Sequence, residues 1–142
     1  MAIKNFELVS IEAKRFANLG EKFPNIRVDH NSTVTMITPV SEREATFDFR
    51  FTANFVGIGV IKIEGKILYE CNAKEVTEMW AKSGNLPNEV ASEIHTVVMM
   101  NCIPEAVLLA RDLRLPSPIP LPTVQFGKKP QQPKPGSGIE VA

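Results

Sequence analysis

Hydrophobic and polar residues alternate most regularly between Glu44 and Phe55. From Phe47 onward the apolar positions of this segment are Phe47, Phe49, Phe51, Ala53 and Phe55, and the residues between them are polar. A period of two predicts a β-strand with one buried face and one face in water. We therefore expect the phenylalanine face of this strand to form the core of a sheet.

Three further segments, residues 5–16, 25–37 and 59–70, also have the composition of strands. The segment 56–59 joins two of the four strands as a hairpin turn. Short links between successive strands favour antiparallel pairing, since a parallel pair needs a long crossover connection. The sequence thus predicts a four-stranded antiparallel sheet.

Irregularities are expected in three of the strands. In the first, the apolar pattern shifts by one residue after Leu8, which predicts a β-bulge near Val9. We expect the second strand to break at residues 30–32 and to end at Pro39. In the fourth strand, Gly65 is the candidate for a bulge.

The pattern changes to a helical period after residue 72. Asn72 is expected to cap a short helix over residues 73–83. A long helix is expected from about Pro87 to Leu113. Pro104 lies inside it and cannot donate a backbone hydrogen bond, which predicts a kink or two helices end to end. The fold class is α+β: a four-stranded antiparallel sheet with a short helix and a long proline-kinked helix packed on one face.

The long helix is apolar on nearly every side. Such a helix must be covered on more than one side, and the sheet of its own chain can cover only one. The second cover is then a partner subunit, a ligand or a bound polypeptide. The residues expected at an oligomer interface are Ile94, Val98, Met99, Cys102, Ala106 and Leu109.

The C-terminal part of the chain has a different composition. Four prolines between residues 116 and 122 favour an extended path after the helix. Residues 127–142 are rich in proline, glycine, lysine and glutamine, and have little to bury. We therefore expect one α+β domain over residues 1–126 and a disordered basic tail over residues 127–142.

The composition of the chain indicates its cellular compartment and limits the classes of partner that it can bind. The 16 basic residues balance the 16 acidic ones, which argues against nucleic acid as a partner. No N-terminal signal-peptide pattern occurs, and no run of about 18 apolar residues predicts membrane insertion. Two cysteines do not make a secreted disulfide framework. The expected location is the cytoplasm.

Catalytic and metal-binding patterns are missing from the sequence. It has two histidines and two cysteines, without CxxC or HExxH spacing, and no nucleotide-binding or nucleophile motif of the usual kinds. His95 is interpreted as an interface histidine, and Cys71 and Cys102 as small buried hydrophobic residues. We expect no catalytic residues, no metal and no cofactor, and hence a binding protein instead of an enzyme.

The order of several motifs over residues 5–126 resembles the SecB family of protein-export chaperones. The matching segments are Phe6-Glu7-Leu8, then Glu64 to Leu68, then Asn101-x-x-Pro104-Glu105-Ala106, and finally Leu121-Pro122-x-Val124-x-Phe126. The resemblance implies helices on one face of the sheet and a homotetramer, a dimer of dimers with the long helices at the interface. It also implies ATP-independent binding of unfolded polypeptides in apolar grooves during protein transport, with delivery to a translocase motor.

The chain departs from that family in two respects. A basic, proline-rich segment replaces the usual second C-terminal helix, and the chain is neutral where the family is acidic. The acidic sheet surface of the family engages the motor, so neutrality argues against motor binding here. These departures suggest a divergent member, such as an archaeal one. They leave open a role as an oligomeric adaptor for one dedicated partner, for example in a toxin–antitoxin system.

If the chain binds clients, apolar residues in loops and extended segments are the candidates for the groove. They are Phe16, Leu19, Phe23, Met36, Ile119, Leu121, Val124 and Phe126. The alternative is that these residues merely close the open end of the core between sheet and helix, because scattered apolar groups are common on protein surfaces.

Overall fold

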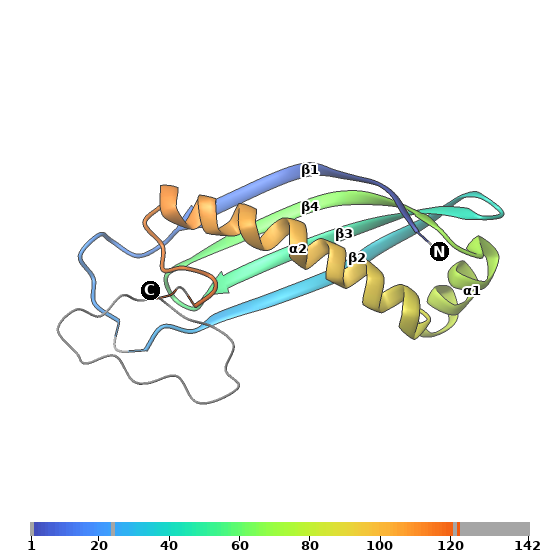
Figure 1. Ribbon diagram of the computed structural model, residues 1–142. Coiled ribbons are helices and arrows are strands. Elements are labelled where there is room, and N and C mark those ends of the chain that lie inside the picture. Colours follow the sequence, from blue (N-terminus) through green and yellow to red (C-terminus); the bar gives the residue numbers. More distant parts are fainter. Residues whose placement is uncertain (1, 24, 121, 123–142) are drawn as a thin grey trace, which may run out of the picture.

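A computed structural model describes residues 2–23, 25–120 and 122. Its strands are β1 (Ile3–Arg15), β2 (Val28–Ser41), β3 (Glu44–Phe55) and β4 (Gly59–Glu70), and its helices are α1 (Ala73–Ser83) and α2 (Asn88–Asp112) (Figure 1). Three groove candidates, Leu121, Val124 and Phe126, lie outside the described residues, as do the domain boundary at residue 127 and the tail 127–142.

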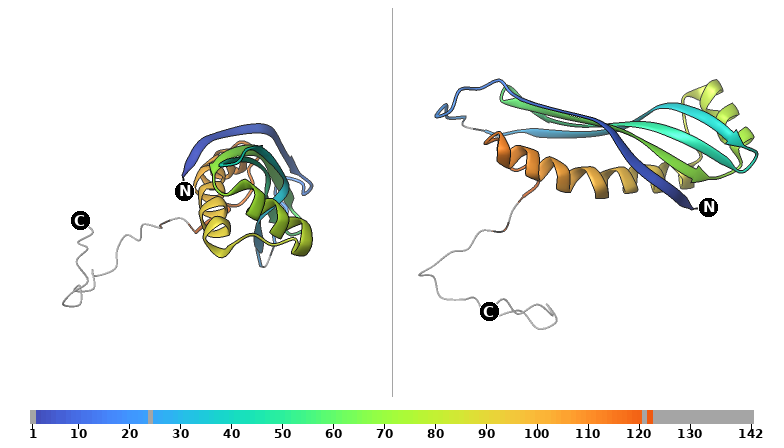
Figure 2. Two further views of the ribbon diagram at one scale, coloured as in Figure 1. Left: turned by 90° about the vertical axis from the view of Figure 1, so that its right-hand side faces the viewer. Right: turned by 90° about the horizontal axis from the view of Figure 1, so that it is seen from above.

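The four strands form one antiparallel sheet in the order β1-β4-β3-β2. Strands β2 to β4 follow one another, and β1 lies beside β4, which is a Greek-key arrangement. The long helix α2 runs lengthwise along the sheet, and α1 lies at the end of the sheet where β2 finishes (Figures 1 and 2). The predicted α+β class with a four-stranded antiparallel sheet is confirmed.

One face of the sheet, here called the inner face, forms the core with the helices. The alternating phenylalanines of β3 and the isoleucines of β4 point to this face and are almost fully buried. They meet a row of α2 side chains that are also buried: Val90, Ile94, Val98, Cys102, Ala106 and Ala110. The strand β3 has the predicted bounds and the predicted buried face.

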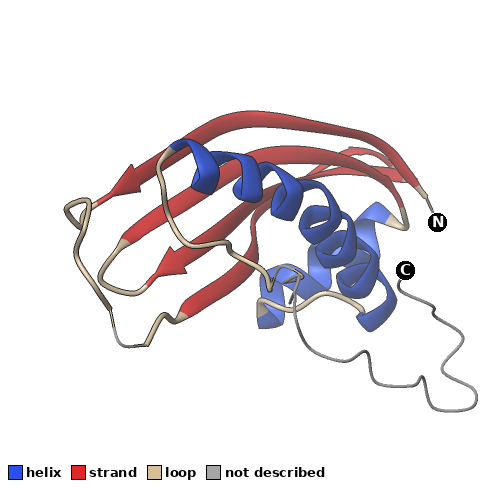
Figure 3. Cartoon of the chain, turned by 60° about the vertical axis from the view of Figure 1, so that its left-hand side comes forward, coloured by secondary structure: helices blue, strands red, loops and turns tan. Residues whose placement is uncertain are grey.

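The buried residues of α2 recur at every fourth position. Because an α-helix has 3.6 residues per turn, a spacing of four rotates the buried row by about 40° at each step. A sheet is itself twisted, so a helix that runs along the strands meets it at a slowly rotating angle. The rotating row therefore keeps α2 in contact with the twisted sheet along its length (Figure 3).

Helix α1 matches its prediction in both bounds and cap. The Asn72 side chain accepts a hydrogen bond from the backbone N–H of Glu75 at 3.2 Å. Gly84 ends the helix with a positive φ of 70°, in the left-handed region that favours glycine. Helix α2 continues through Pro104 as one element, so the alternative of two helices end to end is wrong.

Three predicted irregularities are wrong, the first two of them in β2, and one is confirmed. Strand β2 runs unbroken through residues 30–32 and continues past Pro39 to Ser41. Pro39 is tolerated because β2 is an edge strand, where a missing N–H can face away from the sheet. The bulge at Val9 is confirmed by the register shift between Leu8 and Ser10.

Gly65 is not a bulge: it pairs with Phe49 in regular register. Its role is to leave room for neighbours. A Cβ at this position would lie 2.6 Å from Cζ of Phe49 and would also overlap the backbone oxygen of Glu7. The Phe49 ring, which stacks on Phe6 with centroids 5.2 Å apart, fills the space over the glycine.

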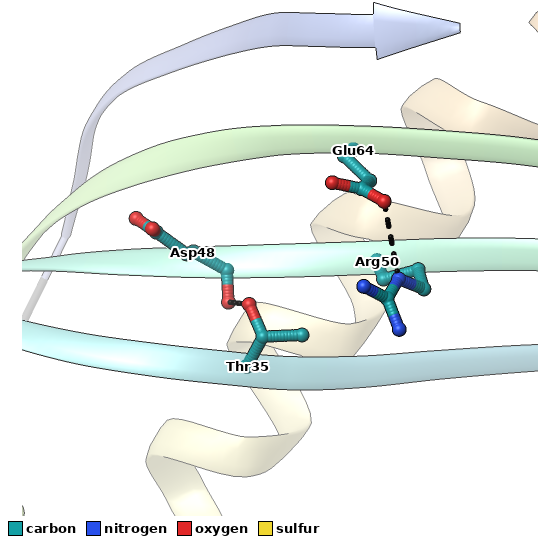
Figure 4. A network of polar contacts seen from close by, with 4 residues as sticks. All are labelled: Thr35, Asp48, Arg50 and Glu64. Atoms are coloured by element: carbon teal, nitrogen blue, oxygen red, sulfur yellow. Dashed lines mark hydrogen bonds and ion pairs between the residues drawn. The ribbon is translucent and has the colours of Figure 1, made fainter. Parts of the chain in front are cut away.

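The outer face of the sheet is polar and carries charges of both signs. Arg50 Nε lies 3.2 Å from Glu64 Oε1 across β3 and β4, and the Thr35 hydroxyl donates to the Asp48 carbonyl oxygen at 3.3 Å (Figure 4). The register also places Lys66 opposite Asp48. This face thus mixes basic and acidic groups, in contrast to an acidic surface of one sign.

Candidate functional site

Four of the six residues expected at an oligomer interface belong to the core of the protomer instead. These four have no exposed surface: Ile94, Val98, Cys102 and Ala106. They form most of the row that α2 buries against its own sheet, so a second subunit cannot reach them without unfolding the first. Met99 and Leu109 are half-buried on the flanks of α2 and remain accessible. The interface prediction is therefore wrong for the four buried residues.

The side of α2 that faces away from the sheet carries its own apolar residues. This helix stripe consists of Met100, Pro104 and Leu108, also at every fourth position, with Met100 71% and Leu108 54% exposed. On one flank of the stripe lie half-buried apolar side chains, Met99, Ile103 and Val107. The expectation that α2 offers apolar surface beyond its sheet contact thus holds, but the most exposed residues, Met100 and Leu108, are not among those first expected.

The α2 helix is also long and apolar enough to cross a membrane, judged by length and composition over the described residues. This differs from the sequence reading, which found no candidate. Packing of its buried row against the sheet is one use of that apolar composition that the structure shows.

A second apolar surface lies at the end of the sheet where β1 leads into the loop toward β2. In this end cluster, Phe16 and Leu19 are more than half exposed, and Phe23 is half-buried. Ile119, which is also half-buried, lies on the segment after α2. The segment after α2 reaches the same end of the molecule (Figure 1). Four of the predicted groove residues are thus brought to one end of the fold.

Arg15 ties the elements of the end cluster together. Its Nη1 donates to the carbonyl oxygen of Leu113, at the end of α2, at 2.6 Å, and its Nε donates to the carbonyl of Ala17 at 3.0 Å. The backbone N–H of Phe16 donates to the carbonyl of Ile58 at 2.7 Å. A positive side chain at a helix C-terminus also meets the negative end of the helix dipole.

Met36, another predicted groove residue, does not lie with the others. The register of β2 and β3 shifts between Val34 and Met36, and this bulge turns Met36 to the outer face, opposite Asp48. Its side chain is 54% exposed there. Met36 therefore cannot share a groove with the end cluster.

A third apolar surface lies on β1. Leu8 and Ile11 point to the inner face, yet they are 40% and 45% exposed. The reason is that α2 packs mainly against β2, β3 and β4, and leaves the inner side of β1 largely uncovered. Alternation in the sequence predicts which face of the sheet these residues share, but it cannot show how far a helix extends across that face.

A groove of about 510 Å³ lies between the edge of β2, helix α1 and the start of α2. Its apolar lining includes Val34, Met79, Trp80 and Leu86. Met79 and Trp80 are not among the groove residues expected from the sequence. Their spacing from Val76 gave a signal, because a short helix that buries only Ala73 and Val76 leaves its later apolar residues for another contact.

The two histidines lie near this groove and the adjoining part of β2. His95 Nδ1, on α2, is 2.7 Å from the Ser32 hydroxyl on β2, so the pair links helix and sheet. His30 lies two residues before Ser32, with its ring 6.3 Å from that of Phe51. Among the described residues, no three His, Cys, Asp or Glu side chains are grouped as metal ligands would be.

Both cysteines are free and buried. Burial raises the pKa of the Cys71 thiol, and burial together with the nearby Glu105 raises the pKa of Cys102 to about 12. Because the thiolate is the nucleophilic form, raised pKa values keep both thiols unreactive near neutral pH. Their interpretation as small hydrophobic residues agrees with this burial.

Tyr69 joins the sheet to α2 through a polar contact. Its hydroxyl donates to Glu93 Oε2 at 2.6 Å, and its ring packs edge-on against Phe47. Burial, and next the Glu93 carboxylate, raise the pKa of the Tyr69 hydroxyl well above its usual value near 10. The neutral phenol is therefore the form that the fold stabilises.

We expect Tyr69→Phe to lower the free energy of unfolding by about 1–2 kcal/mol near pH 7, since a hydrogen bond to a charged group is lost. The raised pKa means that this stabilisation is complete below pH 10 and declines as the pH rises above it. Urea unfolding from pH 8 to 11.5 should show the difference between wild type and Tyr69→Phe shrinking above pH 10. A constant difference would contradict the assigned role of the phenol, and Glu93→Gln serves as the control that keeps a neutral acceptor.

Comparisons of the chain with models of protein families, with curated proteins and with solved structures find no match.

Proposed function

We propose that this protein is an ATP-independent chaperone that binds non-native polypeptides on apolar surfaces of a homo-oligomer and holds them for folding or export. The observation that supports the proposal is the number of large apolar side chains that stay exposed although the protomer buries a core of its own. They include Leu8, Ile11, Phe16, Leu19, Met100 and Leu108. Exposed apolar patches of this kind mark binding surfaces in soluble proteins.

Binding by such surfaces needs no chemical step. An unfolded segment exposes apolar side chains, and their transfer from water to the protein contributes about 25 cal/mol for each Å² buried. Because only the unfolded state binds, the protein shifts the folding equilibrium of its client by mass action. Exposed methionines such as Met79 and Met100 suit this task, since their flexible side chains adapt to different partners.

We further propose that the helix stripe of α2 forms the contact between protomers. The SecB-like resemblance suggests a homotetramer built as a dimer of dimers, with long helices at the interface. In this protein the stripe of Met100, Pro104 and Leu108 supplies the accessible apolar surface for such an interface, because the other side of α2 is buried against the sheet. The end cluster and the inner side of β1 then remain for clients.

Delivery to a translocase motor is not part of the proposal. In the family that this sequence resembles, an acidic sheet surface makes that contact. Here the outer face mixes charges, with Arg50 next to Glu64 and Lys66 opposite Asp48. Basic groups within the surface weaken attraction to a basic partner, because like charges at an interface are costly.

The test is light scattering on a sizing column, with and without an unrelated, permanently unfolded polypeptide such as a reduced and carboxymethylated protein. We expect an oligomer whose mass rises by about one client mass. An oligomer that ignores several unrelated unfolded chains would contradict the chaperone proposal. That result, together with stoichiometric capture of one folded protein, would favour the adaptor alternative.

A further inference from the structure

The free edge of β2 differs along its length. Strand β2 lies at one edge of the sheet, so alternate residues direct their backbone N–H and C=O groups away from β3. Beyond Val34 the edge is interrupted by a register shift before Met36, by Pro39, and by a second shift before Ser41. Bulges and prolines are devices that prevent strand pairing. The half from Val28 to Val34 has neither.

The other edge of the sheet is less open to pairing. Strand β1 has register shifts between Ile3 and Asn5 and between Leu8 and Ser10, so its longest regular stretch, residues 10–15, is slightly shorter than residues 28–34 of β2. It also carries five charged residues, Lys4, Glu7, Glu12, Lys14 and Arg15, whereas residues 28–34 of β2 carry one, Asp29. Charged side chains on an edge strand oppose the addition of another strand. The first half of β2 is therefore the better pairing site of the two edges.

The groove of about 510 Å³ lies beside this open half of β2, since Ser32, Thr33 and Val34 belong to its lining. A strand added to β2 would have its inward side chains over Met79, Trp80 and Leu86. The described lining of this groove contains no Asp, Glu, Lys or Arg. By contrast, a larger pocket of about 620 Å³, at the turn between β2 and β3 and the start of α1, is lined by Glu42, Arg43, Glu70 and Lys74. An uncharged segment matches the first groove, and a charged one does not.

We propose that the open half of β2, Val28–Val34, pairs with an extended, uncharged client segment, which places an apolar or aromatic side chain in the groove at Trp80. This inference rests on the proposed function, and it specifies which part of a client the protein recognises. Main-chain hydrogen bonds to the edge do not depend on client sequence, and the groove adds a preference for alternate apolar side chains.

The chain contains its own reporter for this site, because Trp80 is its only tryptophan. The probe is a soluble, end-blocked nonapeptide of alternating valine and threonine with a central phenylalanine. On addition to the full chain we expect the Trp80 emission to shift to the blue as the peptide excludes water. Amide hydrogen exchange in residues 28–34 should slow at the same peptide concentrations.

Two substitutions separate the groove from other apolar surfaces. Met79→Lys places a charge in the groove at a 42% exposed position near the C-terminus of α1, where a positive charge is tolerated by the helix. We expect it to weaken peptide binding at least tenfold. Met36→Lys makes the same change at an exposed methionine on the outer face, and it should leave the affinity within about twofold of wild type.

Backbone pairing is tested by two peptides that carry one N-methyl group at neighbouring residues. Neighbouring amides point to opposite edges of a strand, so only one methyl group faces β2. One methylated peptide should lose binding at least tenfold and the other should keep it. Equal affinities, or binding to Met79→Lys as tight as to wild type, would overturn the proposal.

The outcomes distinguish this inference from the general function. If the protein captures unfolded polypeptides while Trp80 emission and the exchange of residues 28–34 do not change, the function stands and this site is wrong. If it captures none, both are wrong. Protection of residues 28–34 that rises with protein concentration alone would show that a second copy of the chain occupies the edge, and would also overturn the proposal.

Discussion

Replacement of Gly65 by alanine should lower the free energy of unfolding by about 3 kcal/mol, and replacement by valine should prevent folding. The added Cβ would lie 2.6 Å and 2.8 Å from ring carbons of Phe49 and would overlap the backbone oxygen of Glu7. Overpacking a well-filled core costs about 1–3 kcal/mol. The upper end is expected here, since one of the two neighbours is backbone in the paired strand β1 and cannot rotate away.

Urea unfolding followed by circular dichroism measures this effect. Lys66→Ala, at the next position and on the outer face, is the matched control and should change stability by less than about 0.5 kcal/mol. A Phe49→Leu background tests the mechanism, because a smaller side chain removes one of the two clashes. In that background the cost of Gly65→Ala should fall by roughly half; an unchanged cost would show that the ring is not the obstacle.

The elements of this fold could be predicted because their patterns are local. Alternation in β3, the shift of pattern at Val9 and the cap at Asn72 each reflect one strand, one bulge or one helix end. Gly65 was misread because a glycine within a strand is compatible with both a bulge and a close approach. Only the position of the Phe49 ring, set by the pairing of β3 with β4, distinguishes them.

The candidate site was less predictable because it depends on faces and distances between elements. By alternation from Val34, Met36 would lie on the inner face, but the bulge after Val34 turns it to the outer face. Leu8 and Ile11 have a core pattern, but α2 does not extend over them. The groove at Trp80 is made from three separate parts of the chain, and no local pattern indicates that they meet.

In helix α2, too, the sequence pattern does not indicate which residues face the sheet. A pair of substitutions in this helix is expected to show this most clearly. Because it is apolar on all sides, periodicity could not show which row of residues faces the sheet. Val98 and Leu108 therefore look equivalent in the sequence, yet Val98 has no exposed surface and Leu108 is 54% exposed. We expect their replacement by aspartate to have opposite results.

Val98→Asp should abolish the native fold, because burial of an unpaired carboxylate costs roughly 4 kcal/mol or more, which is a large part of the stability of a small domain. Leu108→Asp should leave the protomer folded, with a stability change below about 1 kcal/mol, and should reduce the mass of the oligomer. Circular dichroism and light scattering on the same samples separate the two effects. Thr96→Asp, a polar and exposed position on the same side of α2, controls for added charge. A Leu108→Asp protein with the wild-type mass would place the contact between protomers elsewhere than on the helix stripe.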